Sequence, residues 1–237
     1  DQIQQAVAQA AESRAGVKLG IGDDAAVLEV PAGQHLVAAT DTLNTGTHFP
    51  ADTAPADIAH KCLAVNLSDL AAMGASPRWA LLSLSLPQAD PEWLQSFIRG
   101  FQSLAQQNGV TLVGGDTTSG PLSVCLTALG VIEQGRQLQR DGARPGDLLV
   151  VSGTIGGAAR VLELLRDGKT ATQRQLLDRP QPRVALGQAL VGYANACVDI
   201  SDGLLADLGH VVRASGCGAR VELERLPFAG LLADIGE

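Results

Sequence analysis

The sequence is poor in lysine and has no long apolar run. Its only lysines are Lys18, Lys61 and Lys169, and 17 Lys and Arg stand against 25 Asp and Glu, for a formal net charge of −8. This balance argues against a protein that holds nucleic acid by neutralising phosphates along its length. No stretch approaches the ~20 consecutive apolar residues that cross a bilayer. We therefore expect a soluble protein that binds neither nucleic acid nor membrane.

Cysteine is also scarce and scattered. Cys62, Cys125, Cys197 and Cys217 form no CxxC pair and have no neighbouring His that would complete a zinc site. Reduced, buried thiols are the expected state, as in cytosolic proteins. Residues 1–14 are polar and rich in Ala and Gln, without the apolar core of a signal peptide. These features predict a cytoplasmic location.

The familiar phosphate-binding loops are missing as well. Gly168-Lys169-Thr170 is no P-loop, because the required earlier glycine is Glu163 here and a helical run, not a strand, precedes it. Residues 153–157 are glycine-rich but do not match GxGxxG, so we interpret them as a helix-entry loop. No kinase catalytic loop of the HRD type occurs. A bound nucleotide would therefore need its phosphate charge balanced by something other than lysine.

Aspartate, by contrast, is abundant. Seventeen of the 25 acids are Asp and eight are Glu, although Glu is the better helix former. Many of these Asp lie beside Gly, Thr or Ser at the ends of apolar runs. Turn and cap chemistry explains any single case, but four such sites favour oxygen ligands for Mg²⁺, more than one ion bridging a polyphosphate. The candidate ligands are Asp24, Asp41, Asp69, Asp116, Asp199 and Asp202.

Asp69 is the sharpest candidate, because it lies in a helical run between Leu67, Leu70 and Met73. An unpaired carboxylate on a largely apolar helix costs several kcal/mol unless a cation or hydrogen-bond donors compensate it. A helix with one wet face is the alternative. Asn66, three residues earlier, would share the face of Asp69 and help to orient it.

Three other polar residues are candidates for contacts with ligands. Arg140 has the fork geometry that suits phosphate oxygens, although a surface arginine is the alternative. His48 lies in a loop from which it would touch a substrate. Ser201 is not placed in a GxSxG turn, so the sequence gives little support for it as a nucleophile. The turn that carries it precedes a helix, whose N-terminus adds positive potential.

The chain has room for one large domain or two smaller ones at roughly 100–200 residues each. Glycines and a proline interrupt the polar stretch 135–146. We therefore predict an N-terminal domain over residues 1–137, which binds metal and ATP and dimerises, and a C-terminal domain over residues 138–237.

Apolar periodicity and turn residues predict the elements of both domains. In the first, we expect helices over residues 55–73 and 91–108, and strands over 25–30, 35–40, 79–86, 110–113 and 122–132, the first two joined by a hairpin or tight connection. In the second, we expect strands over 148–152, 197–200 and 219–223, and helices over 157–166, from residue 182, and over 204–214. The first half reads as α+β and the second as α/β.

Five motifs occur in a characteristic order. They are Gly20-Ile21-Gly22-Asp23-Asp24-Ala25, Thr40-Asp41-Thr42 with His48-Phe49, AVNLSDLAAMG at residues 64–74, VGGDTT at 113–118 and VDISDGL at 198–204. Together they closely resemble the thiamine-monophosphate kinase family, over nearly the whole chain. That family shares a superfamily with aminoimidazole ribonucleotide synthetase, selenophosphate synthetase and a hydrogenase maturation factor.

The resemblance implies an architecture and an activity. Its N-terminal α+β domain would carry a four-stranded sheet that pairs with a second subunit's sheet into a barrel, followed by an α/β C-terminal domain. ATP and several Mg²⁺ ions would lie between the domains of this homodimer. The γ-phosphoryl group would pass directly, in line, to thiamine monophosphate and give thiamine diphosphate, without a dedicated catalytic base.

The resemblance also implies roles for single residues. It implies metal ligation by Asp24, Thr40, Asp41, Asp69, Asp116, Asp199 and Asp202. It implies ATP contacts for Gly115, Asp116, Arg140 and Ser201, and a substrate contact for His48. Family members continue beyond the equivalent of Glu237 into a segment that helps to hold the thiamine ring, so the C-terminal domain is expected to be incomplete in this sequence.

Two other functions stay open. One is another ATP-dependent reaction of the superfamily, like that of aminoimidazole ribonucleotide synthetase. A selenophosphate synthetase is disfavoured, because it would carry a reactive Cys or selenocysteine near its N-terminus, and the first Cys here, Cys62, lies in a predicted helix. The second is a non-catalytic module that binds nucleotide and metal.

Overall fold

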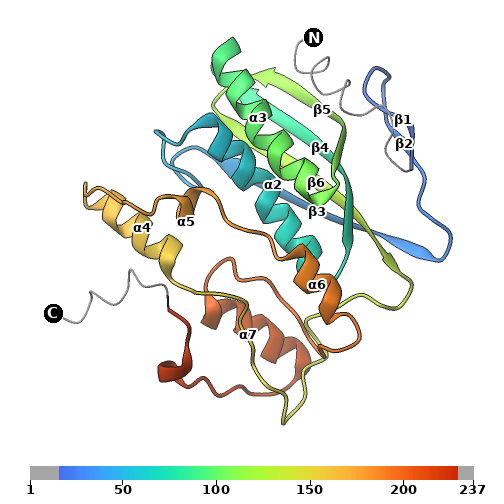
Figure 1. The fold of residues 1–237 in the computed structure, drawn as a ribbon, viewed down its shortest axis with the longest axis vertical. Helices are drawn as coiled ribbons and strands as arrows, with labels where there is room; N and C mark the ends of the chain where they lie inside the picture. The colour runs from blue at the N-terminus through green and yellow to red at the C-terminus, as the bar shows by residue number, and fades with distance from the viewer. Residues whose placement is uncertain (1–15, 229–237) are drawn as a thin grey trace.

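The computed structural model describes residues 16–228 of the chain. Its centre is a four-stranded sheet of order β3-β6-β4-β5, in which β4 and β5 run parallel and the other neighbours antiparallel (Figure 1). The strands are β3 (Gln34–Asn44), β4 (Ser76–Leu86), β5 (Thr111–Ser119) and β6 (Ser123–Glu133). The α+β character and the four-stranded sheet are confirmed.

Two helices cover one face of this sheet: α2 (Pro55–Ala72) and α3 (Pro91–Asn108) (Figure 1). Both begin at a proline, which suits the first helical position. The Asp90 side chain accepts hydrogen bonds from the backbone N–H groups of Glu92 and Trp93, and α3 ends at Gly109 with φ 67°. The predictions of these helices are confirmed. Their buried residues form the main hydrophobic core with the inner face of the sheet.

The two helices approach each other closely at Gly100. A Cβ atom at this position would overlap the backbone of Ala56 in α2, including its carbonyl oxygen. Glycine is therefore required here by the packing of one helix on the other.

The N-terminal strands pair differently from the prediction. β1 (Val17–Leu19) pairs with β2 (Val27–Leu28), while β3 pairs with β6. The predicted strands 25–30 and 35–40 therefore do not form a hairpin with each other, and that alternative of the prediction is wrong. The connection is nevertheless tight, because Gln34 N donates to Pro31 O at 3.2 Å. β5 continues six residues past its predicted end at Val113, because β4 offers it a parallel partner as far as Leu86.

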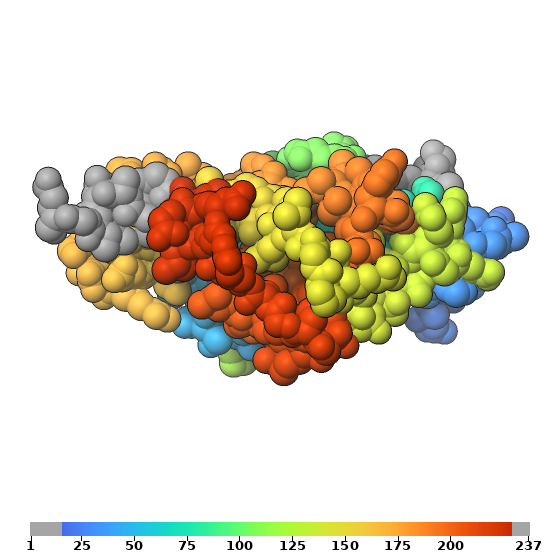
Figure 2. Space-filling model, turned by 90° about the horizontal axis from the view of Figure 1, so that it is seen from below, coloured from blue at the N-terminus to red at the C-terminus, as the bar shows by residue number. Residues whose placement is uncertain are grey.

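The second half is built from short helices. These are α4 (Gly157–Arg166), α5 (Gln175–Asp178), α6 (Val184–Leu190), α7 (Leu204–Ser215) and the 3-10 turn η1 (Leu223–Arg225). The helices predicted after residue 157, after residue 182 and over 204–214 are confirmed. Figure 2, which looks at the molecule from below the view of Figure 1, shows this half, coloured yellow to red, over much of the face toward the viewer.

The three strands predicted for the second half are wrong within the described residues 16–228. Residues 148–152, 197–200 and 219–223 run without assigned strand pairing, and one isolated bridge joins Ile155 to Phe228. A strand is stabilised by hydrogen bonds to a neighbouring strand, and these segments find none. The side chains of Leu148 and Val150 are accordingly 89% and 81% exposed.

The second half packs on α2 through α6. A Cβ atom at Gly187 in α6 would overlap the backbone of Ala71, and Leu138 N donates to Met73 O at 3.0 Å. These contacts hold the chain after the sheet against the C-terminal end of α2. No helix in residues 16–228 has both the length and the apolar character to cross a membrane.

Candidate functional site

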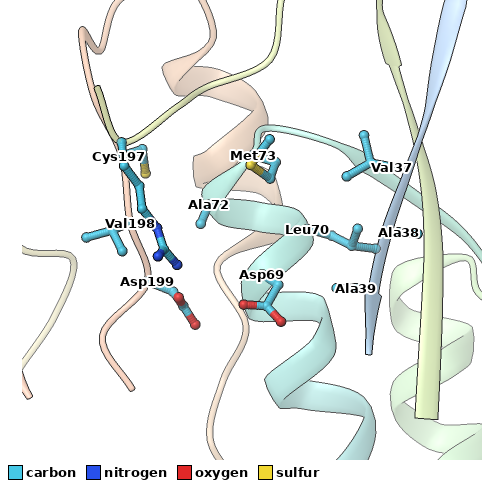
Figure 3. A pocket seen from close by; sticks show the side chains of 11 residues that line it. Val37, Ala38, Ala39, Asp69, Leu70, Ala72, Met73, Cys197, Val198 and Asp199 are labelled. Atoms are coloured by element: carbon cyan, nitrogen blue, oxygen red, sulfur yellow. The ribbon is translucent and has the colours of Figure 1, made fainter. Parts of the chain in front are cut away.

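A cavity of about 210 Å³ lies where the two halves meet. Its walls come from β3, from the last turn of α2 and from the segment before α7 (Figure 3). The polar groups in its lining are Asp69, Arg140 and Asp199, beside the apolar Val37, Met73 and Val198. Two carboxylates and a guanidinium from distant parts of the sequence thus line the same cavity.

Asp69 projects from α2 toward the segment that carries Asp199, and both carboxylates extend into the same gap (Figure 3). Partial burial, reinforced by the charges of Asp199 and Asp41, raises the pKa of Asp69 to about 6, while Arg140 opposes the shift. The carboxylate of Asp41 on β3 is therefore also part of this electrostatic cluster. Burial, with Asp199 next, raises the pKa of Asp41, and His48 opposes that shift.

This cluster makes a prediction for the metal-free protein. The pKa of Asp69 is about 6 when folded, above its ordinary value of 3.8. The stability that the protonated Asp69 carboxyl contributes is therefore fully present below its unfolded pKa of 3.8, and it is lost as the pH rises through its folded pKa of about 6. We expect Asp69→Asn to be more stable than the wild type at about pH 7.5, with a smaller difference at about pH 4.5.

Urea unfolding in a chelating buffer at the two pH values measures this difference. If the difference in stability between Asp69→Asn and the wild type is the same at both pH values, the carboxylate cluster is contradicted.

Thr40 precedes Asp41 on β3, so the two side chains lie on opposite faces of the sheet. The Thr40 hydroxyl donates to Leu126 O at 3.1 Å and lies 3.0 Å from Thr127 Oγ1. One lone pair of the Thr40 oxygen remains for a cation under this arrangement. Its role as a metal ligand stays a prediction.

His48 lies in the loop between β3 and α2. Its Nδ1 accepts a hydrogen bond from Asn44 N at 3.0 Å, so the neutral ring carries its proton on Nε2. Lys61 Nζ donates to His48 O at 2.8 Å, and Phe49 is buried in the core. The loop thus orients an Nε2–H donor, which suits a phosphate or other anionic oxygen.

The turn before α7 is organised by a residue that the sequence analysis missed. Asp207, 4% exposed, accepts hydrogen bonds through Oδ2 from Ser201 N at 2.9 Å, Asp202 N at 3.2 Å and Gly203 N at 3.1 Å. Asp207 therefore satisfies three amides of the turn that precedes the helix, and the expectation that the helix N-terminus adds positive potential for a ligand stays a prediction. The detectable signal was a second aspartate five residues after Asp202.

Gly115 lies on β5 with φ 150°, where a Cβ atom would overlap the backbone of Leu82 in β4. Close approach of the two strands therefore requires glycine here, apart from any contact with ATP.

Asp24, Asp116 and Asp202 are exposed and do not line the cavity. Among residues 16–228, no group of three or more His, Cys, Asp or Glu side chains is arranged to hold a metal ion. Asp41 pairs with Leu126, Leu126 with Leu82, and Leu82 with Gly115, the residue before Asp116 on the far strand. Three strand spacings of about 4.8 Å put the backbones of Asp41 and Asp116 about 14 Å apart, and their side chains lie on opposite faces of the sheet, so one ion cannot contact both.

Comparison with known proteins defines the class first. The sequence model of the AIR synthase related protein N-terminal domain matches residues 22–132, and that of the C-terminal domain matches residues 144–234. A hydrogenase maturation protein, E. coli HypE, shares the fold at 22% identity, with a TM-score of 0.80 over 99% of this chain and 75% of that one.

Closer relatives fix the family within this class. Thiamine-monophosphate kinase of Escherichia coli (strain K12) is 50% identical over 93% of this chain and 70% of its own length. The crystal structure of thiamine-monophosphate kinase from Stenotrophomonas maltophilia K279a aligns with a TM-score of 0.91 at 48% identity, over 99% of this chain and 77% of that one. The structure of AaThiL complexed with AMPPCP and TMP aligns with a TM-score of 0.80 at 35% identity, over 90% of this chain and 71% of that one. The chain belongs to the thiamine-monophosphate kinase family.

Proposed function

We infer that this protein catalyses the ATP-dependent phosphorylation of thiamine monophosphate to thiamine diphosphate. The observation that carries this inference is 50% identity to a thiamine-monophosphate kinase over 93% of the chain. The likeness to AaThiL complexed with AMPPCP and TMP supports ATP and thiamine monophosphate as the two substrates.

Direct, in-line transfer of the γ-phosphoryl group fits the residues of the cavity. Both reactants are anionic, so their approach needs positive charge more than it needs a base. The acceptor is already an ionised phosphate oxygen, and no dedicated catalytic residue is required. Arg140 would contact phosphate oxygens, where its guanidinium stabilises charge on the transferring group.

Several Mg²⁺ ions would supply the remaining positive charge. No three acidic side chains of residues 16–228 converge on one point, but Mg²⁺ commonly takes one or two carboxylates and completes its shell with phosphate oxygens and water. Burial and neighbouring negative charge raise the pKa of both Asp41 and Asp69, so a cation beside them would be stabilising, and Asp199 lies within electrostatic range of both. We propose these three as the first ligands. Thr40, Asp24, Asp116 and Asp202 would complete the metal set, with Gly115, Asp116 and Ser201 contacting ATP and His48 contacting thiamine monophosphate.

We propose that the protein is a homodimer whose two sheets form a barrel. The open face of the sheet, which no helix of residues 16–228 covers, supports this proposal because a second copy of the sheet would bury it. Asp116 lies in register with Ser83, while Leu82 and Leu84 face the helices, so Asp116 is on the open face of the sheet. Leu36 and Leu81 are also exposed on the sheet.

Sedimentation at micromolar concentration is expected to give a dimer, because an open sheet face with exposed leucines is stabilised by burial against its copy. A monomer at that concentration would contradict the shared barrel.

The domain division at residues 137 and 138 also remains our proposal. The family models support it, because the two matched ranges are separated by residues 133–143. We further propose that the C-terminal α/β domain needs chain beyond this sequence to complete its sheet. Support comes from Leu148 and Val150, which are exposed where a strand would be covered.

We also propose that the protein is cytoplasmic. Its four free cysteines are consistent with this location.

A coupled assay tests the proposed function. The protein is supplied with ATP, Mg²⁺ and thiamine monophosphate, and thiamine diphosphate is measured by chromatography. Formation of thiamine diphosphate with equimolar ADP supports the inference. ADP formed only with another acceptor would instead favour a different superfamily reaction, and nucleotide binding without turnover would favour a non-catalytic module.

A further inference from the structure

The loop that carries His48 is held by a segment from the other half of the chain. Residues 174–180, which include α5, lie against residues 52–60, which end the loop and begin α2. We call this contact the clasp. It joins parts of the sequence more than 100 residues apart, since the Arg174 and Asp52 pair spans 122 positions.

Arg174 is the centre of the clasp. Its Nη1 and Nη2 donate to the two carboxylate oxygens of Asp52 at 2.7 and 2.9 Å, and Nη2 also donates to Thr53 Oγ1 at 3.1 Å. Its Nε donates to Asp178 Oδ2 at 2.6 Å. A planar guanidinium that forks onto a carboxylate in this way fixes orientation as well as distance.

Arg179 and His60 extend the clasp along α2. Arg179 Nη1 donates to Asp57 Oδ1 at 2.6 Å, and its Nη2 lies 3.3 Å from His60 Nδ1. Since Nδ1 accepts from the arginine, His60 Nε2 carries the proton and donates to Pro180 O at 3.0 Å. The segment 174–180 is therefore attached to the helix at successive points.

The far end of the loop is fixed by further contacts. Phe49 is buried in the core, and Lys61 Nζ donates to His48 O. Lys61 is also within electrostatic range of Asp178, the buried partner of Arg174. His48 thus sits between two anchored points, one in the N-terminal core and one at Arg174.

We propose that Arg174 is a positioning residue for thiamine monophosphate, which acts by holding the His48 loop in place through Asp52 and Thr53. This inference rests on the proposed function, in which His48 contacts the substrate. Its consequence is that the second half of the chain helps to set the substrate side of the site without touching the substrate.

Steady-state kinetics of Arg174→Met and Asp52→Ala test the proposal. We expect Arg174→Met to raise the KM for thiamine monophosphate about 10-fold, while the KM for ATP stays within about 2-fold, because a misplaced contact weakens one substrate selectively. Asp52→Ala should act in the same direction, and it leaves the pair between Arg174 and the buried Asp178 intact. Asp167→Ala removes a comparable exposed pair with Lys169 in the same half and should change neither KM.

Hydrogen exchange of the loop provides a readout apart from activity. In the wild type, Gly46 N donates to Phe49 O at 2.8 Å and His48 N to Asn44 O at 2.9 Å. Exchange at the amides of residues 46–49 and 51–53 should be faster in Arg174→Met and in Asp52→Ala than in the wild type or Asp167→Ala. Unchanged exchange, or faster exchange with an unchanged KM for thiamine monophosphate, would overturn the proposal.

The two readouts separate failure of this inference from failure of the proposed function. A wild type that does not phosphorylate thiamine monophosphate defeats the proposed function and with it the substrate role of Arg174. A wild type that is active, beside folded variants with wild-type KM values, defeats only the inference. If Arg174→Met does not fold, Asp52→Ala decides, because Asp52 is 71% exposed and its loss leaves no buried charge unpaired.

Discussion

Replacing Asp69 by asparagine is expected to lower the turnover of thiamine monophosphate at least ~100-fold, as loss of a charge-stabilising group commonly does. The carboxylate sits in the cavity with Asp199 and Arg140, and the amide of asparagine cannot balance a divalent cation. The coupled assay at saturating ATP and Mg²⁺ measures the loss. A folded Asp69→Asn enzyme with near-normal turnover would remove the metal-assisted mechanism.

Asp90→Asn is the matched control for this substitution. Asp90 caps α3 and does not line the cavity, and asparagine is also a good N-cap residue. The turnover of Asp90→Asn should equal that of the wild type.

Asp116→Asn tests how far the metal set extends. A loss similar to that of Asp69→Asn would place Asp116 in the metal set, whereas normal turnover would confine the set to the cavity of one protomer.

Gly100→Val is expected to destabilise the protein by about 3 kcal/mol or more, because its side chain would have to displace the backbone of α2. The overlap involves main-chain atoms of Ala56, which cannot move aside as a flexible side chain would. Urea unfolding measures the change. The matched control is Ser103→Val, on the exposed side of the same helix, which should change stability by less than about 0.5 kcal/mol. Equal stability of the two variants would contradict the close contact.

The parts of the fold that local signals determine were predictable from the sequence. α2 and α3 have a proline at the start, a glycine after the end and apolar residues at helical spacing. Strand pairing was harder to predict, because it depends on residues far away in the chain. Residues 148–152 have a strand-like composition but gain no neighbour in residues 16–228, and β5 continues past Val113 because β4 runs beside it.

The candidate site shows the same division. The sequence singles out Asp69, because a carboxylate within an apolar helical pattern needs a compensating partner. Arg140, whose charge is opposite, lines the same cavity, together with the like-charged Asp199, and metal ligation by Asp69 stays a prediction. Asp207 was not predicted, because its function depends on a side chain that folds back onto three amides of its own turn. Asp24 and Asp116 are exposed and do not line the cavity, so their predicted place in the metal set stays a prediction.

The hydrogen bonds that Asp207 accepts have a consequence for ligand affinity. With three consecutive N–H groups already bound, the backbone from Ser201 to Gly203 is held in one shape before any nucleotide arrives. A segment that is already ordered loses little conformational entropy when a ligand binds, so less of the favourable binding free energy is offset.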